Sequence, residues 1–545
     1  MDHGYSPARA LPLLFPRGKM GGSMRYLVAF LFAVSASSPV FAHWHEAQSE
    51  HFVVYADDSA DDVKKFAEML ERYHSALGFL TRRDIPSPSP SNRVTIFAVG
   101  NERDVRKLVG ENASNVAGFY IPRAGGSRAF VPDVRVSHGD PHFSFIVLLH
   151  EYAHHFLIGS SRYAMPNWLS EGAAEFFASS RFPRDGSVQI GRPAYHRAAE
   201  LYYAADVRVE ELLDHELYEQ NRGKGYDAFY GRAWALYHYL TFSEERGGQL
   251  AEYWRVIAEG TPARAAAEQV FGDLDKLERE LDSYLRQRRI HTFNLKPELV
   301  PIGTVTVRRL SEGMDEAMPL RIRSQRGVSR EQALELLPDA RKVAARYPND
   351  ADVLAVLAEA EHDAGNDAEA IAAADRAIAI DPTVENAYVQ KGLSLFRIAS
   401  EADDPDAAYA AAMVPFSKLN KLENDHPLPL IYYYRSFLER GEMPTETAKH
   451  ALERAAELAP FDRDLALNAA IMQISEGKIG LARYNLKPVA ADPHGGGMAD
   501  QARALLAKLE GVDEGTALLG GELWSEPEIA ASDTPAEPTE ETLRN

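Results

Sequence analysis

The chain has 545 residues, which is more than one ordinary hydrophobic core supports, so two or more domains are expected. Apolar residues make up 45% and charged residues 26%, the balance of a soluble globular protein, and the formal net charge is −21 at pH 7. Such an acidic surface repels phosphate backbones, so a nucleic-acid partner is not expected. Because there is no cysteine, disulfides, thiolate metal ligands and a cysteine nucleophile are excluded, and any transition-metal site must use histidine and carboxylates.

Residues 1–42 carry the features of a secretory signal. Arg25 precedes an apolar run over 26–34, and small residues follow up to Ala42, after which cleavage is expected. The run is short for a membrane span, although an anchoring helix is the alternative. The residues before Met24 do not resemble the start of a signal, which indicates that translation begins at Met20 or Met24. We therefore expect an exported protein, in a bacterial periplasm, with no membrane span in the mature chain.

Residues 43–292 alternate between strand and helix patterns and predict a domain that mixes both. Strand patterns at 51–55 and 93–98 flank a helix predicted over 61–79 from its apolar spacing. Residues 118–120 and 127–131 predict a hairpin, with Gly125 and Gly126 at its turn. A helix is expected from near His142, and helical periodicity returns over 226–245 and 274–289.

Residues 329–512 predict an all-α domain of paired helices. The segments that begin at Tyr347 and Asp381 are offset by 34 residues, the length of a tetratricopeptide repeat. In that alignment Ala358, Ala370 and Ala377 occupy the small positions, where the two helices of a repeat approach closely. An unrelated helical bundle is the alternative, because the tryptophan and tyrosine positions of the repeat motif are weak. Residues 293–328 show no repeat and are interpreted as a connecting segment, and the acidic tail 513–545 is expected to be disordered.

The sequence His150-Glu151-Tyr152-Ala153-His154 matches the HExxH pattern. On a helix, residues four apart project from one face, so two imidazoles converge on one ion. Glu151 lies at the rim of the same face, where it can reach a water at the metal without being a ligand. By itself the pattern leaves open a buried helix that carries histidines and no metal.

Residues 166–175 supply a third ligand. Catalytic zinc usually takes three protein ligands and leaves the fourth position to water. Glu171 provides a carboxylate at a suitable distance along the chain. Glu175, one helical turn later, could accept the outer N–H of a ligating histidine or form an ordinary salt bridge. The expected centre is Zn²⁺ held by His150, His154 and Glu171, with Glu151 as general base.

The combination HEYAH plus NWLSEGAAEFF resembles the gluzincin zinc peptidases, in particular the peptidase MA-like domains that are joined to tetratricopeptide repeats. The resemblance spans about residues 44–289 in layout, but its specific motifs are confined to 150–176 and 229–236. It implies an α+β zincin-like peptidase domain over 43–292, followed by an all-α tetratricopeptide-like domain. It also assigns Tyr230 to stabilisation of the oxyanion, with Tyr226 in reserve, whereas packing in the core is the alternative for Tyr230.

The chain departs from the aminopeptidase N family, which carries a G-x-M-E-N segment for the free amine of its substrate. The corresponding residues 126–131 lack that segment, which favours an endopeptidase. By the same resemblance, this strand is expected to border the cleft and to pair with extended substrate. His155 is expected to pack or to bond a carbonyl, and Tyr237, His238 and Tyr239 are expected to lie in the core.

The predicted function is that of an exported zinc metallopeptidase, which hydrolyses peptide bonds by zinc-activated water with Glu151 as base. Its repeats are expected to bind a polypeptide substrate or a protein partner. One alternative is a scaffold or chaperone-like protein whose zinc domain is structural or degenerate. Another is a different periplasmic zinc peptidase whose third ligand lies further along the chain than Glu171.

Overall fold

The computed structural model describes residues 43–83, 85–110, 116–135, 138–160, 164–223, 225–492 and 496–521. The predicted signal and the part of the predicted tail beyond residue 521 lie outside this range. From residue 42 onward the chain belongs to one compact unit. Within the described ranges, no helix combines the length and the apolarity needed to cross a bilayer.

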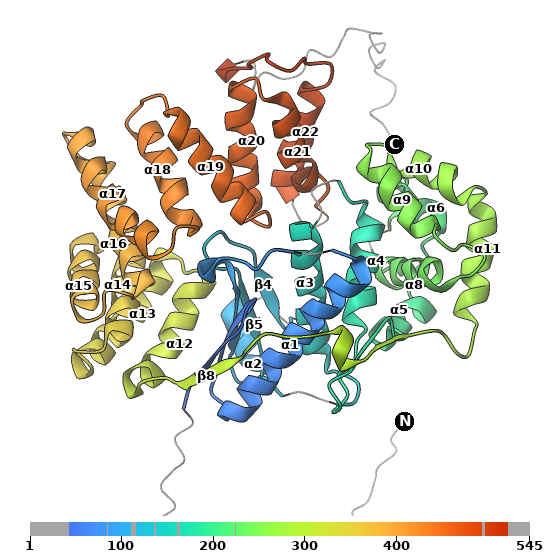
Figure 1. Cartoon of the computed structure of the whole chain (residues 1–545), viewed down its shortest axis with the longest axis horizontal. Helices are drawn as coiled ribbons and strands as arrows, with labels where there is room; N and C mark the ends of the chain where they lie inside the picture. Colours follow the sequence, from blue (N-terminus) through green and yellow to red (C-terminus); the bar gives the residue numbers. More distant parts are fainter. Residues whose placement is uncertain are drawn as a thin grey trace, which may run out of the picture. The chain divides into compact units, whose positions relative to one another are not determined.

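A mixed sheet forms the centre of the N-terminal half (Figure 1). In the described part of the chain it has six strands, in the order β4-β5-β3-β2-β1-β8. Strands β2, β3 and β5 are parallel neighbours, whereas β4, β1 and β8 pair antiparallel with theirs. The strands are β1 (His45–Gln48), β2 (Phe52–Ala56), β3 (Val94–Ala98), β4 (Phe119–Ile121), β5 (Arg128–Val131) and β8 (Thr306–Arg309).

The hairpin predicted around Gly125 is present as β4 and β5, but the two strands occupy different places in the sheet. Strand β5 is paired on both sides, with β3 and with β4. Among the described residues β4 pairs with β5 alone and ends the sheet. The expectation that residues 126–131 offer a free edge to substrate is therefore wrong, because ladder hydrogen bonds already use both sides of β5. On this side the sheet ends at β4, among the described residues.

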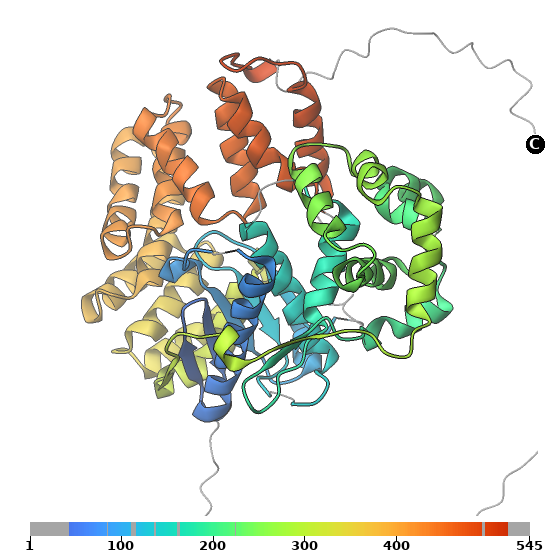
Figure 2. The same ribbon diagram turned by 45° about the vertical axis from the view of Figure 1, so that its right-hand side comes forward.

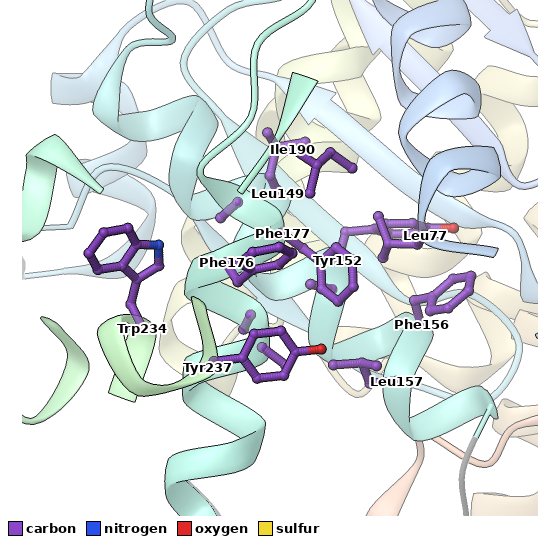
Figure 3. Close-up of a cluster of buried hydrophobic side chains, with 14 of the residues drawn as sticks. Leu77, Leu149, Tyr152, Phe156, Leu157, Phe176, Phe177, Ile190, Trp234 and Tyr237 are labelled. Carbon is purple, nitrogen blue, oxygen red and sulfur yellow. The ribbon is translucent and has the colours of Figure 1, made fainter. Parts of the chain in front are cut away.

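Helices pack on the sheet around one large apolar core. Helix α1 (Ala60–Thr81) begins at Ser59, whose side chain accepts from the backbone N–H of Asp62, and its predicted apolar face is buried. Helices α3 (Phe143–Ser160), α4 (Asn167–Ala178) and α8 (Phe229–Phe242) share that core. Figure 3 shows Leu77 of α1, Tyr152 of α3, Phe177 of α4 and Tyr237 of α8 gathered in it. The core thus fixes α3 and α4, which carry the predicted ligands, relative to one another.

Shorter helices complete the N-terminal half. They are α2 (Glu102–Val109), α5 (Ala198–Tyr203), α6 (Val209–Leu213), α7 (His215–Asn221), α9 (Gln249–Ala258), α10 (Ala263–Phe271) and α11 (Leu274–Leu285). The predicted elements are present with ends that differ by a few residues. Two strands of the main sheet were not predicted as such: β1 precedes the first predicted strand, and β8 lies far along the chain.

The segment 293–328 does more than connect the two halves. Strand β7 (Phe293–Leu295) pairs with β6 (Val188–Ile190), and β8 pairs with β1 at the other end of the main sheet. Helix α12 (Glu312–Arg326) packs against the first repeat helices. Its Met314 and Met318 share a core with Phe97 and Phe130 of the sheet, so this segment is part of both halves.

The C-terminal half consists of tetratricopeptide-like helical repeats, as predicted (Figures 1 and 2). Ala358, Ala370 and Ala377, the predicted small positions, are fully buried where neighbouring helices touch. The helices are α13 (Arg330–Arg346), α14 (Ala351–Asp363), α15 (Asp367–Ile380), α16 (Glu385–Ala399), α17 (Pro405–Leu422), α18 (Pro427–Glu439), α19 (Glu446–Leu458), α20 (Arg463–Ser475), α21 (Ile479–Ala490) and α22 (Gly496–Lys508).

The predicted boundary of the disordered tail, at residue 513, lies too early in the chain. The backbone N–H of Gly515 donates to the carbonyl of Gly477 at 2.8 Å, and Glu514 accepts from the N–H of Gly480 at 2.8 Å. Leu518 packs against the core of the last repeat helices. Residues 513–518 are therefore held in place by backbone hydrogen bonds and apolar contact, which a composition-based prediction does not detect.

Candidate metal centre

The three predicted ligands meet at one point between α3 and α4. His150 and His154 lie one turn apart on α3 and project from the same face, and Glu171 faces them from α4. The two histidine Nε2 atoms are 3.1 Å apart. Glu171 Oε2 lies 3.3 Å from Nε2 of His150 and 3.4 Å from Nε2 of His154.

The size of this triangle matches a tetrahedral zinc site. Ligand atoms bound at about 2.0–2.1 Å and at tetrahedral angles lie about 3.3–3.4 Å from one another. The three ligand atoms of this site are 3.1, 3.3 and 3.4 Å apart, and they come from two imidazoles and one carboxylate, which are ligands typical of zinc. The three residues therefore fit a zinc ion without rearrangement.

Both histidine rings are oriented through their other nitrogen. Nδ1 of His150 lies 3.1 Å from Glu175 Oε1, and Nδ1 of His154 lies 3.2 Å from Ser170 Oγ. These contacts turn Nε2 of each ring toward Glu171, which is the arrangement that outer partners impose in zinc sites. Glu175 also pairs with His196 at 2.6 Å and with Arg197 at 2.5 Å, so it forms ion pairs besides its contact with His150.

The carboxylates give the site a potential that favours a cation. Burial on its own would lower the pKa of His150, but the hydrogen bonds and charges of Glu171 and Glu175 outweigh it and raise this pKa to about 10. Burial would raise the pKa of Glu175, yet His150, His196 and Arg197 hold it well below its usual range. Positive charge at His150 is thus stabilised by the surrounding carboxylates.

Glu151 does not belong to the triangle but lines the cleft beside it. This cleft has a volume of about 420 Å³ and is lined by Glu151 and His154 of α3 and by Ser170 of α4. Edge strand β4 contributes Phe119 and Tyr120 to it. Glu151 is thus a partly exposed carboxylate that directly follows His150 and faces the cleft.

His155 packs against other rings, as predicted, and it also has a side-chain partner that was not predicted. Its Nδ1 lies 2.6 Å from the hydroxyl of Tyr120, whereas the predicted alternative to packing was a bond to a carbonyl. Its ring also stacks on Tyr152, with centroids 5.6 Å apart, and lies against Phe461 of the repeats at 4.5 Å. The long-range partners of His155 could not be inferred from its neighbours in the sequence.

Tyr230 lies close to the site but is not among the residues that line the cleft. It is in the first turn of α8, and the Arg197 guanidinium sits 4.6 Å from its ring centroid. Burial and then the negative charge of Glu171 raise the pKa of Tyr230, so its hydroxyl stays protonated. Tyr226 is 67% exposed and donates to Glu200 at 2.9 Å. The oxyanion role of Tyr230 stays a prediction.

The prediction that the end of α8 lies in the core is confirmed. Tyr237, His238 and Tyr239 are buried, and His238 bonds the Tyr284 hydroxyl and the Gly191 carbonyl, both at 2.7 Å. These contacts satisfy both ring nitrogens of His238 away from the candidate metal centre.

Sequence reasoning missed several residues around the ligands. His196 and Arg197 hold Glu175 from a segment that shows no motif, and Tyr120 lies on a strand of three residues.

Two further residues could have been found from the sequence. Ser170 could have been noticed, since it directly precedes Glu171. Gly172 could also have been noticed: a Cβ there would lie 2.5 Å from the Ala233 carbonyl oxygen, so only glycine lets α4 approach α8 this closely.

Comparisons with known proteins give one family match to part of the chain and several similar solved structures. A family described as "Protein of unknown function (DUF1570)" matches residues 146–264, which include the HExxH helix, Glu171 and Tyr230. No curated protein gives a match.

The solved structures that resemble this chain contain helical repeats. The tetratricopeptide protein TTC0263 of Thermus thermophilus is 14% identical, with a TM-score of 0.29, and the match covers 36% of this chain and 97% of that one. A crystal structure of MamA is 19% identical, with a TM-score of 0.24, over 36% of this chain and 98% of that one. The Cut9–Hcn1 assembly is 13% identical, with a TM-score of 0.15, over 66% of this chain and 82% of that one. At these identities and scores, the likenesses carry no argument about function.

Proposed function

We propose that this protein is a zinc peptidase in which His150, His154 and Glu171 hold the metal and Glu151 is the general base. The observation that supports this most directly is the zinc-sized triangle of ligand atoms beside the cleft that Glu151 lines. A structural zinc site normally has four protein ligands and needs no base, whereas three ligands next to an open space are typical of a catalytic one.

The side chains of this chain have distinct tasks in the proposed reaction. Zinc bound here would act as a Lewis acid and lower the pKa of a water toward about 7. Glu151 accepts the proton of the water that attacks the scissile carbonyl carbon, and then delivers it to the leaving amine nitrogen. Glu175 and Ser170 keep Nε2 of each histidine turned inward. Tyr230 is proposed to donate to the oxyanion.

The edge of the sheet supports a polypeptide as substrate. Strand β4 ends the sheet in the described part of the chain, and its Phe119 and Tyr120 line the cleft. A peptide that pairs with an unpaired strand edge gains main-chain hydrogen bonds irrespective of its sequence. A substrate segment extended along β4 would be held next to Glu151, which favours cleavage within a chain. We keep export to a periplasm as part of the proposal, on the basis of the signal-like residues 1–42.

The helical repeats favour a second candidate function. Repeat arrays of this kind present extended surfaces to protein segments. In this alternative the protein is a scaffold or chaperone-like factor, and the metal centre is structural or degenerate. The comparisons give the peptidase no support of their own, since the matched family has no known activity and the solved structures found are repeat proteins. The position of Glu151 favours the peptidase.

Metal analysis combined with peptide hydrolysis separates the two functions. We expect about one zinc ion per chain in the wild type and in Glu151→Gln, with hydrolysis of casein or a peptide library by the wild type only. Glu171→Gln should lose most of the zinc. Glu216→Gln, an exposed carboxylate on α7, serves as the matched control and should behave as the wild type. Activity retained in Glu151→Gln refutes the assigned base, and a zinc-loaded wild type that hydrolyses nothing favours the scaffold.

A further inference from the structure

The cleft beside the metal centre has two walls that come from opposite ends of the chain. One wall consists of α3, α4 and β4, as described above. The other consists of the residue pair before α20, Pro460 and Phe461, and of residues on α20 and α21 that include Tyr484 and Pro488. The repeats therefore contribute directly to the space next to Glu151.

Specific contacts hold this second wall against the first. The backbone N–H of Ala124, in the β4–β5 turn, donates to Asp462 Oδ2 at 2.8 Å. Asn92 Nδ2 donates to the carbonyl of Leu458 at 3.2 Å, just before Pro460. Phe461 is 6% exposed, and its ring lies 4.5 Å from that of His155, the neighbour of a metal ligand. Phe461 is thus held between the β4–β5 turn and helix α3.

The chemistry of the second wall favours an apolar group in the cleft. Phe461, Pro460, Pro488 and Val489 face it from the repeats, and Leu157, Ile158 and Phe119 face it from the other side. The charged side chain of Arg463 forms an ion pair with Asp492 within the wall. Because that charge is neutralised, the wall offers apolar contact more than attraction for a charged side chain.

We infer that α20 and α21 form the substrate-selecting wall of the cleft. The ligand class is an extended polypeptide segment that runs between β4 and α21 and places an aliphatic or aromatic side chain against Phe461 and Tyr484. The volume of about 420 Å³ suits a few residues of extended chain, and it excludes a folded domain. This inference rests on the proposed peptidase function and names the substrate class for it.

Two residues of α21 provide a matched pair for the test. Tyr484 is 46% exposed and lines the cleft, whereas Leu481 is 48% exposed and is not among the lining residues. Because both are on the surface of one helix, neither Tyr484→Ala nor Leu481→Ala should unfold the protein. Phe461→Leu, a smaller change at a buried position, serves as an additional variant.

The probes are fluorescein-labelled pentapeptides that differ at the central residue, which is Leu, Phe, Asp or Lys. Fluorescence anisotropy measures their binding to the zinc-loaded Glu151→Gln protein, and kcat/KM is measured with the wild-type base. We expect the Leu and Phe peptides to bind best. Tyr484→Ala should weaken their binding about tenfold, and Leu481→Ala should change it less than about twofold. Phe461→Leu should shift the preference between the Leu and Phe peptides.

The outcomes separate this inference from the proposed function. If the wild type hydrolyses peptides but Tyr484→Ala behaves like Leu481→Ala, or the central residue has no effect, the wall does not contact substrate and the inference is overturned. If nothing is hydrolysed but Tyr484→Ala still weakens peptide binding selectively, the peptidase proposal fails and the wall stands as a binding groove. If the zinc-loaded protein neither binds nor cleaves the peptides, both are overturned.

Discussion

The hydroxyl of Tyr120 and Nδ1 of His155 lie 2.6 Å apart, which joins edge strand β4 to helix α3, which carries His150 and His154. Burial and the nearby His51 lower the pKa of His155 to about 3, so its ring is neutral and accepts a hydrogen bond from the Tyr120 hydroxyl. The bond sets how far β4 stands from His154 and Glu151, and therefore where a peptide paired with β4 would meet them.

Tyr120→Phe tests this connection. We expect a cost of about 1–3 kcal/mol in stability, because Nδ1 of His155 is left buried without its donor. Zinc content should not change, whereas KM for a peptide should rise, because the edge strand is less well positioned. Thermal unfolding, metal analysis and steady-state kinetics measure these effects, with Tyr195→Phe, at a 66% exposed position, as the control. An unchanged KM would show that the bond does not position β4.

Gly172→Ala should lower both the stability of the protein and its affinity for zinc. The added Cβ would lie 2.5 Å from the Ala233 carbonyl oxygen and 2.9 Å from the carbonyl carbon, so α4 must move away from α8 and take Glu171 with it. We expect a loss of about 1–3 kcal/mol and a lower zinc affinity, measured by thermal unfolding and by chelator competition.

Gly159→Ala is the control for that substitution. Gly159 is also helical, but among the described residues nothing lies within 4 Å of its Cβ position. Its replacement should be neutral or slightly stabilising, by up to about 1 kcal/mol. If the two variants have the same stability and zinc affinity, close packing of α4 on α8 is not what positions Glu171.

Glu175→Gln should reduce zinc affinity without removing a ligand. Glu175 accepts from Nδ1 of His150 at 3.1 Å and also pairs with His196 and Arg197. Loss of such an outer carboxylate typically lowers metal affinity about 10–100-fold. Competition with a fluorescent chelator measures the change, and Glu171→Gln, which removes a ligand, should lower the affinity further. Equal effects of the two would contradict the outer position of Glu175.

Acidification should unfold the protein through its buried histidines. Burial and then the charge of His51 lower the pKa of His74 to about 3, and the pKa of His155 is also about 3. The unfolded chain, with ordinary histidine pKa values of about 6.5, binds more protons between these limits, so stability is full above pH 6.5 and falls as the pH drops toward 3. Each histidine lowers the free energy of unfolding by up to about 2 kcal/mol at pH 5.

Thermal unfolding of the metal-free protein between pH 7.5 and 5 measures this effect without interference from zinc release. His74→Gln keeps an acceptor for the Tyr152 hydroxyl, 2.7 Å from His74 Nδ1, but cannot be protonated. Its melting temperature should therefore fall less steeply with acid than that of the wild type. Parallel curves for the two proteins would exclude His74 as a source of acid sensitivity.

Local patterns in the sequence predicted the three candidate ligands and the repeats. The helical period places His150 and His154 on one face, whatever surrounds the helix. Glu171 and Ser170 occur in a short motif that itself forms a helix, and the 34-residue offset follows from two helices and two turns of standard length. These features depend on residues close together in the chain, so they could be predicted from the sequence.

Only the tertiary structure decided which strand ends the sheet beside the cleft, what holds Glu175, and what forms the far wall of the cleft. Strand β8 joins β1 from about 260 positions away, Arg197 reaches Glu175 across a loop, and Phe461 meets His155 from the other half of the chain. No local period or motif encodes such contacts. They arise when separate apolar faces are buried together, and that packing placed the repeats beside the candidate metal centre.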